Sequence, residues 1–297
     1  MQTSELTFGI EIECFLPAAT VSERNIIVGG YHSPIQVPGL PAGWKTGRDG
    51  SLHTRKRGMI AMEIVSPILR GREGLEQVVE VYRILNEWGV HTNASCGLHI
   101  HVGTGNGQRS LRHNARALKN LVHLVAQFER ALFALTGTKR REHGTYAGPV
   151  SSCYRAIADL TSVDQAQVVA TKFRALNLCP LFSGKRTVEF RVFQGTANVT
   201  KVVGYVQVVL GLVARAYAMK RAATWSNGDA RYQNGAGLAY FLLRSLNWGK
   251  CFKRLGDTEY GVLLPERTDA IKREFKRLAK KYDADTQDYH PALRPTA

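Results

Sequence analysis

Cysteine is scarce in this chain of 297 residues, and its five copies are scattered. The number is odd and no C-x-x-C pair occurs, so neither a disulfide framework nor a zinc finger built from thiolates is indicated. The sequence therefore predicts reduced thiols with mostly structural roles. The five residues are Cys14, Cys96, Cys153, Cys179 and Cys251.

Long uninterrupted apolar runs are also lacking. The longest apolar helix candidate, residues 202–218, contains Gln207, Arg215 and two glycines, which makes it a poor membrane span. The first residues lack the basic, apolar and small-residue regions of a secretory leader. We therefore expect a cytoplasmic protein without a membrane span.

Three common nucleotide or nucleophile motifs are missing. The chain contains no Walker A loop, no G-x-G-x-x-G and no G-x-S-x-G, so P-loop, Rossmann and hydrolase-elbow sites lack their markers. No internal repeat, low-complexity segment or clear linker interrupts it. A single catalytic domain spanning residues 1–297 is the favoured organisation.

Acidic residues are outnumbered, with 24 Asp and Glu against 40 Lys and Arg, a net charge of +16 and a pI near 9.9. Basic runs occur at residues 55–57, 139–141 and 267–282. Such a balance favours polyanionic partners such as nucleic acid, phosphorylated substrates or anionic polymers. A basic surface that only confers solubility is the competing interpretation.

Two periodicities divide the ordered part of the chain. Alternating apolar and polar residues predict strands, and apolar residues on one helical face predict helices. The predicted strands are residues 8–14, 59–65, 98–102 and 187–193. The predicted helices are residues 73–88, 110–135 capped by Ser110, about twenty residues from 200, 235–248 and 267–282. Residues 28–42 are expected to be loop, residues 48–51 a turn, and the chain beyond 282 a loose tail.

The polar positions of the first two strands carry glutamates. In a strand over residues 8–14, Glu11 and Glu13 lie on one face, where their like charges repel each other. A cation, a basic side chain or plain solvent can relieve this, and solvation is the commoner outcome for an isolated E-x-E strand. Glu63 is the only charge within the apolar residues 59–65, and a buried carboxylate needs a partner.

The other two strands add histidine and arginine. His99 and His101 share one face, a weak metal signal by itself, and Glu189 and Arg191 share another, where a solvated cross-strand salt bridge is the competing explanation. Together with the glutamates these residues form an oxygen-rich set suited to magnesium or manganese. An arginine beside a metal-binding glutamate also supplies what a nucleotide phosphate needs.

Six short motifs occur in the order found in one known family. They are G-I-E-I-E, D-G-S, M-E-I-V-S-P, C-G-L-H-I-H-V, F-R-A-L-N-L and T-V-E-F-R-V-F-Q-G-T. Over residues 7–215, the chain thus resembles the amidoligase family, which is similar to the glutamine synthetase and glutamate–cysteine ligase superfamily of carboxylate–amine ligases. Residues 220–297 match no motif and are expected to form a helical extension.

The resemblance implies an α+β fold with a curved, glutamine synthetase-like antiparallel sheet and helices packed on its convex side. The concave polar face would bind ATP and magnesium or manganese ions. By the motif match, Glu11, His99 and Glu189 would hold the metal near the ATP phosphates. Glu13 and Glu63 would hold the metal near the acid substrate.

Further motif positions imply contacts with the nucleotide or its phosphates. His101 would lie towards the nucleotide, and Arg191 would stabilise the transferred γ-phosphate. Arg174 and Asn177 match an R-x-x-N element that lines the substrate or phosphate region, which implies a catalytic role for Arg174 and a nucleotide contact for Asn177. Asp49 stands where the superfamily often has another metal carboxylate, although the spacing differs.

A segment beyond the long second predicted helix matches the family as well. Its Arg140, Arg141 and Tyr146 imply contact with substrate, with no specific chemistry attached.

An ATP-dependent ligase that forms an amide or isopeptide bond is the leading hypothesis. Its acid and amine substrates are not identified by the sequence, and the basic residues 55–57, which lie between two motifs, keep a polyanionic substrate such as nucleic acid or a cell-wall precursor open. A metal-dependent hydrolase that uses His99 and His101 is one alternative. A basic nucleic-acid-binding protein that retains the fold is another.

Overall fold

The computed structural model of this chain describes residues 1–30, 32–105, 107, 109–151, 161–167, 170–220, 234–248, 260–287 and 289. The strands are β1 (Thr7–Pro17), β2 (Ile35–Gln36), β3 (Lys45–Gly47), β4 (Met59–Val65), β5 (Leu69–Arg70), β6 (Gly97–Gly103), β7 (Leu176–Asn177) and β8 (Thr187–Gln194). The α-helices are α1 (Ala18–Glu23), α2 (Gly71–Glu87), α3 (Ala115–Ala134), α5 (Asp164–Gln167), α6 (Val199–Ala218), α7 (Gly235–Ser245) and α8 (Thr268–Asp283).

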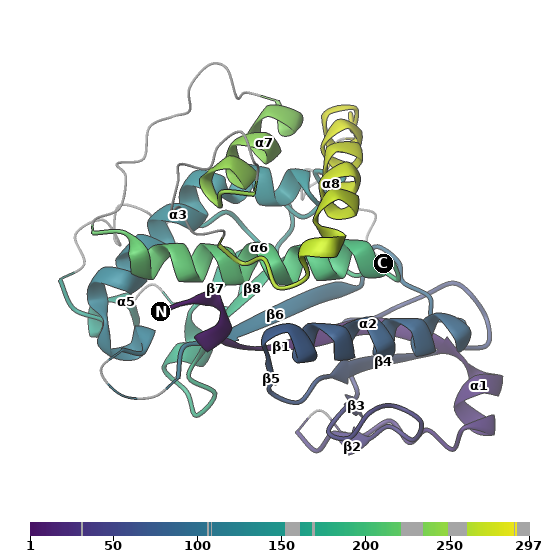
Figure 1. Cartoon of the computed structure of the whole chain (residues 1–297). Coiled ribbons are helices and arrows are strands. Elements are labelled where there is room, and N and C mark those ends of the chain that lie inside the picture. Colours follow the sequence, from purple (N-terminus) through teal and green to yellow (C-terminus); the bar gives the residue numbers. More distant parts are fainter. Residues whose placement is uncertain are drawn as a thin grey trace.

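The strands form one sheet, and the long helices lie on one side of it (Figure 1). The hydrogen-bonded order is β2-β3-β4-β1-β6-β8-β7, and β5 pairs with the start of β1. Each of these named pairs in the described residues is antiparallel. The expected α+β fold, an antiparallel sheet with helices packed against one face, is confirmed.

Alternation along β1 separates the core from the open face. Phe8, Ile10 and Ile12 are at most 2% exposed and pack in the main hydrophobic core, as the strand pattern predicts. The intervening glutamates point to the face that the long helices leave open. The longest strand of the sheet therefore carries one apolar and one polar surface through the centre of the molecule.

Helix α6 is long and apolar enough to cross a membrane by length and composition alone, and among the described residues it is the one such helix. Within the fold, 78% of that apolar segment is buried, and α6 contacts α2, α3, α8 and β6. Its apolar character all round is thus the character of a core helix.

Several sequence-based boundaries need correction. The helix expected from Ser110 begins at Ala115, because Leu111–His113 form a 3₁₀ turn and the Asn114 side chain caps α3 by accepting from the Ala117 backbone N–H at 3.0 Å. The four short strands β2, β3, β5 and β7 were not predicted, since two or three residues are too few to show a period.

The predictions for the turn at residues 48–51, the C-terminal segment and the cysteines have different outcomes. The expected turn at residues 48–51 is formed, with Asp49 Oδ1 accepting from the Ser51 N–H at 2.7 Å. The segment after residue 282 is not a loose tail throughout, because Asp285 accepts hydrogen bonds from Thr138 and Lys139. Cys14, Cys96 and Cys179 are free thiols, the first two of them buried, whereas Cys153 and Cys251 lie outside the described residues.

Candidate active site

Strand register assembles the polar face from residues far apart in sequence. β1 lies between β4 and β6, and β6 lies between β1 and β8, so polar positions on four strands become neighbours. The directly opposed residues are Glu13 and Glu63, Glu11 and His99, and His101 and Glu189. The six strand residues predicted from the sequence are therefore brought together on one surface.

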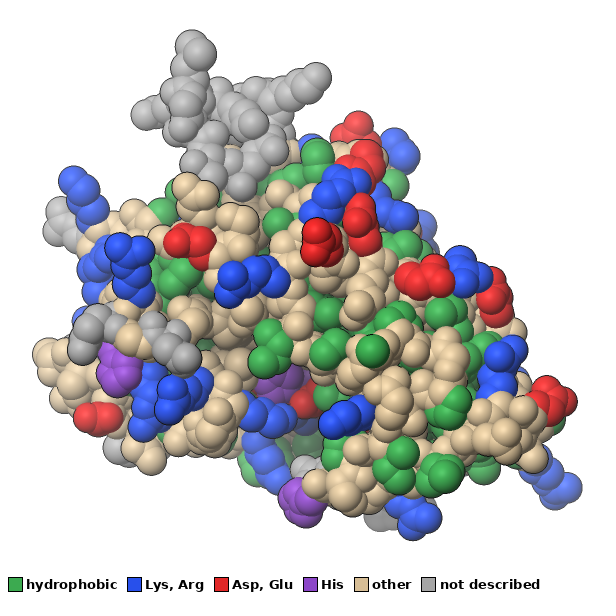
Figure 2. Space-filling view, turned by 60° about the horizontal axis from the view of Figure 1, so that its bottom comes forward, with side chains coloured by type: hydrophobic (Ala, Val, Ile, Leu, Met, Phe, Trp, Pro, Cys, Tyr) green, Lys and Arg blue, Asp and Glu red, His purple; other side chains and the backbone are tan. Residues whose placement is uncertain are grey.

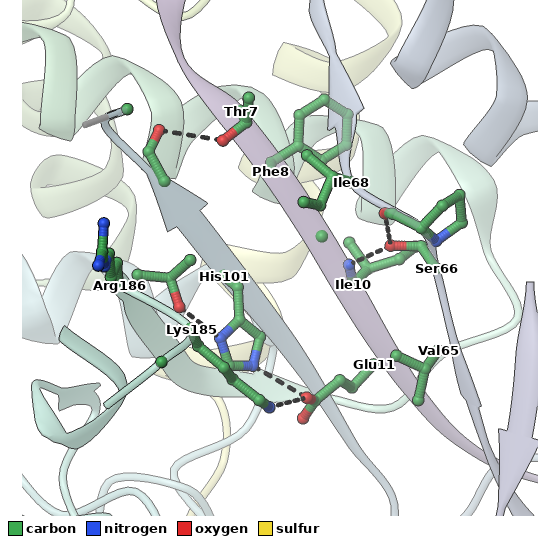
Figure 3. Close-up of a pocket in the computed structure, with 16 residues that line it drawn as sticks. Thr7, Phe8, Ile10, Glu11, Val65, Ser66, Ile68, His101, Lys185 and Arg186 are labelled. Atoms are coloured by element: carbon green, nitrogen blue, oxygen red, sulfur yellow. Dashed lines mark hydrogen bonds and ion pairs between the residues drawn. The ribbon is translucent and has the colours of Figure 1, made fainter. Parts of the chain in front are cut away.

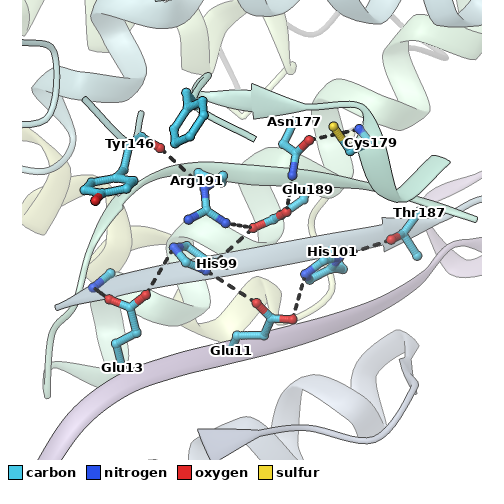
Figure 4. A network of polar contacts seen from close by, with 12 residues as sticks. Glu11, Glu13, His99, His101, Tyr146, Asn177, Cys179, Thr187, Glu189 and Arg191 are labelled. Carbon is cyan, nitrogen blue, oxygen red and sulfur yellow. Dashed lines mark hydrogen bonds and ion pairs between the residues drawn. The ribbon is translucent and has the colours of Figure 1, made fainter. Parts of the chain in front are cut away.

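Glu11 occupies the centre of a network of cationic and neutral donors (Figure 4). Its Oε1 lies 3.0 Å from His101 Nε2 and 3.2 Å from Lys185 Nζ, and its Oε2 lies 3.4 Å from His99 Nδ1. Burial alone would raise the pKa of Glu11, but hydrogen bonding by His101 and His99 outweighs burial and holds that pKa far below its usual value. Glu11 is thus ionised at neutral pH.

His99 spans the two glutamates of β1. Its Nδ1 faces Glu11 and lies 3.6 Å from Glu189 Oε1, while its Nε2 lies 3.6 Å from Glu13 Oε1. The side chain is almost fully buried. The register between β6 and β8 shifts beside His99, a bulge of the kind that re-aims side chains at functional sites.

Glu189 is held by a second layer of contacts. Asn177 Nδ2 donates to Glu189 Oε2 at 2.6 Å, and the Arg191 guanidinium pairs with Glu189 Oε1. Asn177 is 3% exposed, and its Oδ1 accepts from the Cys179 N–H at 2.9 Å. Both ends of the Asn177 amide are thus hydrogen-bonded, which orients Glu189. The contact of Asn177 with the nucleotide stays a prediction.

A second carboxylate cluster lies on the β4 side of the face. Oxygen atoms of Glu13, Asp49 and Glu63 all lie within 4.8 Å of one another. Burial, followed by the charges of Glu11, Glu13 and Asp49, raises the pKa of Glu63 to about 8. Asp49 therefore joins this cluster, although its spacing in the sequence differs from that of the superfamily's metal carboxylate.

The donor set fits divalent cations. Two further groups have ligand atoms within 4.8 Å of one another: Glu11, His101 and Glu189, and Glu11, Glu63 and His99. The oxygen-rich chemistry matches magnesium or manganese rather than a thiolate zinc site. Glu63 is crowded by the like charges of Glu11, Glu13 and Asp49. A cation would relieve this crowding.

A cavity of about 590 Å³ opens beside Glu11, over the first half of β1 (Figure 3). Ser66, Pro67 and the 85%-exposed Ile68 line one side. The opposite side is formed by Lys185, Arg186 and Thr187, and Glu11 and His101 close one end. Although burial favours the neutral amine, the Glu11 carboxylate raises the pKa of Lys185, which therefore presents a stable positive charge to the cavity.

The opposite end of the face is closed by Gly97 and Arg141. Arg141 Nη2 donates to the Cys96 carbonyl at 3.1 Å. A Cβ placed at Gly97 would lie 2.6 Å from Arg141 Nη2, 2.8 Å from His99 Nε2 and 3.1 Å from Glu13 Oε2. Only glycine leaves this space open, and the Gly97 N–H itself donates to Glu13.

The two arginines that were predicted to be catalytic, Arg191 and Arg174, differ in placement. Arg191 lies at the cluster, pairing with Glu189 and donating from Nε to the Tyr146 carbonyl at 3.4 Å. Arg174 donates instead to the Pro149 carbonyl at 3.1 Å, and its buried Nε has no hydrogen-bond partner. No contact joins Arg174 to the carboxylate clusters in the described residues, so its catalytic role stays a prediction.

The surface around the face is basic. Figure 2 shows histidine and acidic side chains recessed in a hollow, with Lys and Arg side chains around its rim. Residues Arg55–Arg57 are exposed, as expected for a basic loop. The net charge of +16 is thus partly gathered around the hollow that holds the carboxylates.

Three residues of the site were not identified from sequence reasoning alone. Lys185 was missed, although two adjacent basic residues directly before a motif strand are a usable signal. Gly97 precedes the His99-x-His101 pair, where a glycine signals a close approach of other groups. Arg141 was expected only to contact substrate, and its position against Glu13 is new.

The open face of the antiparallel sheet thus carries carboxylate clusters, paired histidines and an arginine, a set of side chains that could hold divalent cations. The sequence model of the family described as "Putative amidoligase enzyme" matches residues 4–213. The chain belongs to this family. The resemblance deduced from the six motifs is thereby confirmed. A comparison with curated proteins gave no match.

Two solved structures align with this chain. A bifunctional glutathione synthetase from Pasteurella multocida aligns at 12% identity and a TM-score of 0.46, over 93% of this chain and 48% of that one. The ligase PafA in complex with the prokaryotic ubiquitin-like protein Pup aligns at 8% identity and a TM-score of 0.40, over 95% of this chain and 64% of that one. The chain thus spans about half to two thirds of the length of these proteins.

Proposed function

We propose that this protein is an ATP-dependent ligase that joins a carboxylate to an amine through an acyl phosphate, releasing ADP and phosphate. The observation that carries the proposal is the pair of adjoining carboxylate clusters on one sheet face, with Arg191 at their edge and a cavity of about 590 Å³ at one end. Membership of the amidoligase family supports the same reaction class.

The cavity beside Glu11 is the proposed nucleotide site. A volume of about 590 Å³ suits a ligand of nucleotide size. Lys185 and His101 stand at the end nearest the carboxylates, where the phosphates of ATP would lie, and Ile68 and Pro67 offer apolar contact to the base. Lys185 adds the positive charge that a polyphosphate requires.

Two groups of residues would hold divalent cations, magnesium or manganese. They are Glu11, His99 and Glu189, and Glu13, Glu63 and Asp49. When bound, such cations supply charge neutralisation to the phosphates and the reacting carboxylate. The first group adjoins the nucleotide cavity and the second lies towards Gly97 and Arg141, so each β1 glutamate would serve a different substrate.

The chemistry requires positioning rather than a protein nucleophile. A carboxylate oxygen of the acid substrate attacks the γ-phosphorus, and the bond from that phosphorus to the ADP oxygen breaks. The amine then attacks the acyl carbon, expels phosphate and loses a proton. Contacts with Glu189 and Tyr146 fix the Arg191 guanidinium at the edge of the clusters, where it would stabilise charge on the transferring phosphoryl group.

The basic residues around the hollow favour an anionic acid substrate. Positive potential around a recessed site concentrates anions. A negatively charged acid, free or carried on a polymer such as nucleic acid or a cell-wall precursor, is the substrate class that this rim supports.

The test is a screen for ADP and phosphate release with magnesium, ATP and pools of amino acids, polyamines and peptides. Turnover should require both an acid and an amine. Glu11→Ala serves as the blank, since it removes the contacts to His101 and Lys185, and Glu23→Ala, an exposed residue of α1, is the matched control that should retain activity. Glu13→Ala should impair use of the acid more than use of ATP.

Other products would identify other reactions. Release of AMP and pyrophosphate would sink the acyl-phosphate mechanism. Turnover without ATP would favour the metal-dependent hydrolase. Salt-sensitive DNA binding that is unaffected by Glu11→Ala, with no ATP binding, would favour the nucleic-acid-binding protein.

A further inference from the structure

The loop that carries Arg141 into the site is residues 138–142, directly after the turn that ends α3. From this loop, Arg141 Nη2 reaches the Cys96 carbonyl and the empty space above Gly97, beside His99 and Glu13. Arg141 thus stands at the end of the polar face opposite the cavity, next to the cluster of Glu13, Glu63 and Asp49.

Arg141 is a cation without an acidic partner. No carboxylate of the described residues forms an ion pair with it, and its side chain donates to a backbone carbonyl. Burial, together with the charges of Arg191 and Arg140, lowers the pKa of Arg141 to about 10, opposed by the attraction of Glu13. It therefore remains charged at neutral pH, and its unused donors favour an anion.

The loop is held at both ends by the C-terminal segment. At one end, Asp285 Oδ2 accepts from Thr138 Oγ1 and from the Lys139 backbone N–H, each at 2.9 Å. At the other end, the Tyr282 hydroxyl donates to Glu142 Oε2. Arg140 and Arg141 lie between these two attachments.

Helix α8 gives these attachments a rigid base. Ile271, Phe275 and Leu278 are at most 1% exposed in the core, and α8 contacts α3, α6 and α7. Leu278 also packs against Gly137, whose φ of +78° begins the loop. The helix lies beyond residues 4–213, to which the family match is confined.

We propose that Asp285 and Tyr282 are positioning residues that hold Arg141 as the anion anchor for the carboxylate of the acid substrate. The inference rests on the proposed ligase function. It assigns the C-terminal helix, which lies outside the family match, a part in acid binding: the helix fixes the loop, the loop fixes Arg141, and Arg141 binds the acid beside Glu13.

The first experiment is steady-state kinetics of ADP release, using the acid from the screen that supports turnover. The concentrations of the acid and of ATP are varied separately. Arg141→Ala should raise the KM for the acid about 30-fold, within the 10- to 100-fold range of a hydrogen bond to a charged group. Asp285→Ala and Tyr282→Phe should each raise the same KM about fivefold and leave the KM for ATP unchanged. Asp269→Ala, an exposed acid at the other end of α8, is the matched control.

A double variant separates positioning from general destabilisation. If Asp285 acts through Arg141, the Arg141→Ala/Asp285→Ala protein should have the same kcat/KM for the acid as Arg141→Ala alone. Losses that multiply, a KM for ATP that rises in parallel, or an unchanged KM for the acid in Asp285→Ala would each overturn the proposal.

A second arm needs no substrate. The Lys139 amide donates to Asp285, so hydrogen exchange of the peptide spanning residues 138–142 should accelerate at least tenfold in Asp285→Ala and not in Asp269→Ala. Unchanged exchange would refute the attachment. If exchange accelerates in Asp285→Ala as expected but the wild-type protein releases no ADP with any acid–amine pool, the proposed ligase function is wrong and the loop attachment is right.

Discussion

Replacing Glu63 by glutamine should remove a pH dependence from the stability of the metal-free protein. Glu63 is largely buried opposite Glu13, and its pKa is raised from 4.5 to about 8. Between these two pH values the folded state keeps a proton that the unfolded state has lost, so the free energy of unfolding falls as the pH rises. Glutamine keeps the shape and cannot titrate.

The size of the effect follows from the shift. One pKa unit corresponds to about 1.36 kcal/mol, so integrating from pH 5.5 to pH 8.5 gives a loss of about 3 kcal/mol for the wild type relative to Glu63→Gln. With an unfolding entropy of about 2.1 cal/mol/K per residue, this corresponds to a difference in Tm of about 5 °C. Glu11 does not contribute, because its pKa lies far below this window.

The assay is thermal unfolding by circular dichroism in the presence of a chelator at pH 5.5, 7.0 and 8.5. The Tm of the wild type should fall relative to that of Glu63→Gln as the pH rises, whereas Glu23→Gln on the surface of α1 should follow the wild type. Saturating magnesium should stabilise the wild type more than Glu63→Gln at pH 8.5, because binding uses the ionised carboxylate. Parallel curves for wild type and Glu63→Gln would refute the reasoning.

Two further substitutions test opposite ends of the face. Gly97→Ala places a methyl group 2.6–3.1 Å from Arg141, His99 and Glu13, so acid-dependent turnover should fall at least tenfold with the fold retained by circular dichroism, while Gly50→Ala, which meets nothing within 4 Å, should be neutral. Lys185→Gln removes the cation beside the cavity, so steady-state kinetics should show a KM for ATP about tenfold higher and little change in the KM for the acid. A higher KM for the acid alone would place Lys185 at the wrong substrate.

The strand pattern was sufficient to predict which side chains share the polar face. Period-two alternation fixed the faces of Glu11, Glu13 and His99 because strand geometry is local. It left open which strands are neighbours, since that depends on contacts between residues about 40 to 100 positions apart. The resemblance carried by the six motifs implied instead which side chains share a site, Glu13 with Glu63 and Glu11 with His99, and the register of β1, β4 and β6 places the members of each pair opposite one another.

The parts that could not be predicted lie in loops and in tertiary contacts. Lys185 reaches Glu11 from an irregular turn in which Arg186 adopts a φ of +53°, and such a path has no period to read. The role of Asp285 depends on the packing of α8 against α3, which no local pattern encodes. The start of α3 could have been predicted, because asparagine is as good an N-cap residue as serine and Asn114 lies directly before the helix.

The spacing of the two β1 glutamates explains why they should have separate roles. Residues i and i+2 on one strand are about 7 Å apart. At this separation two carboxylates can bind different ions, and one imidazole can still lie between them. His99 does span them, with Nδ1 towards Glu11 and Nε2 towards Glu13. In the proposed reaction, Glu11 would work with Lys185 at the cavity, and Glu13 would work with Glu63 towards the other end of the face. A nucleotide and an acid bound there would meet near His99. Arg191 would then stabilise the transferring phosphoryl group, because it pairs with the same Glu189 oxygen that His99 Nδ1 faces.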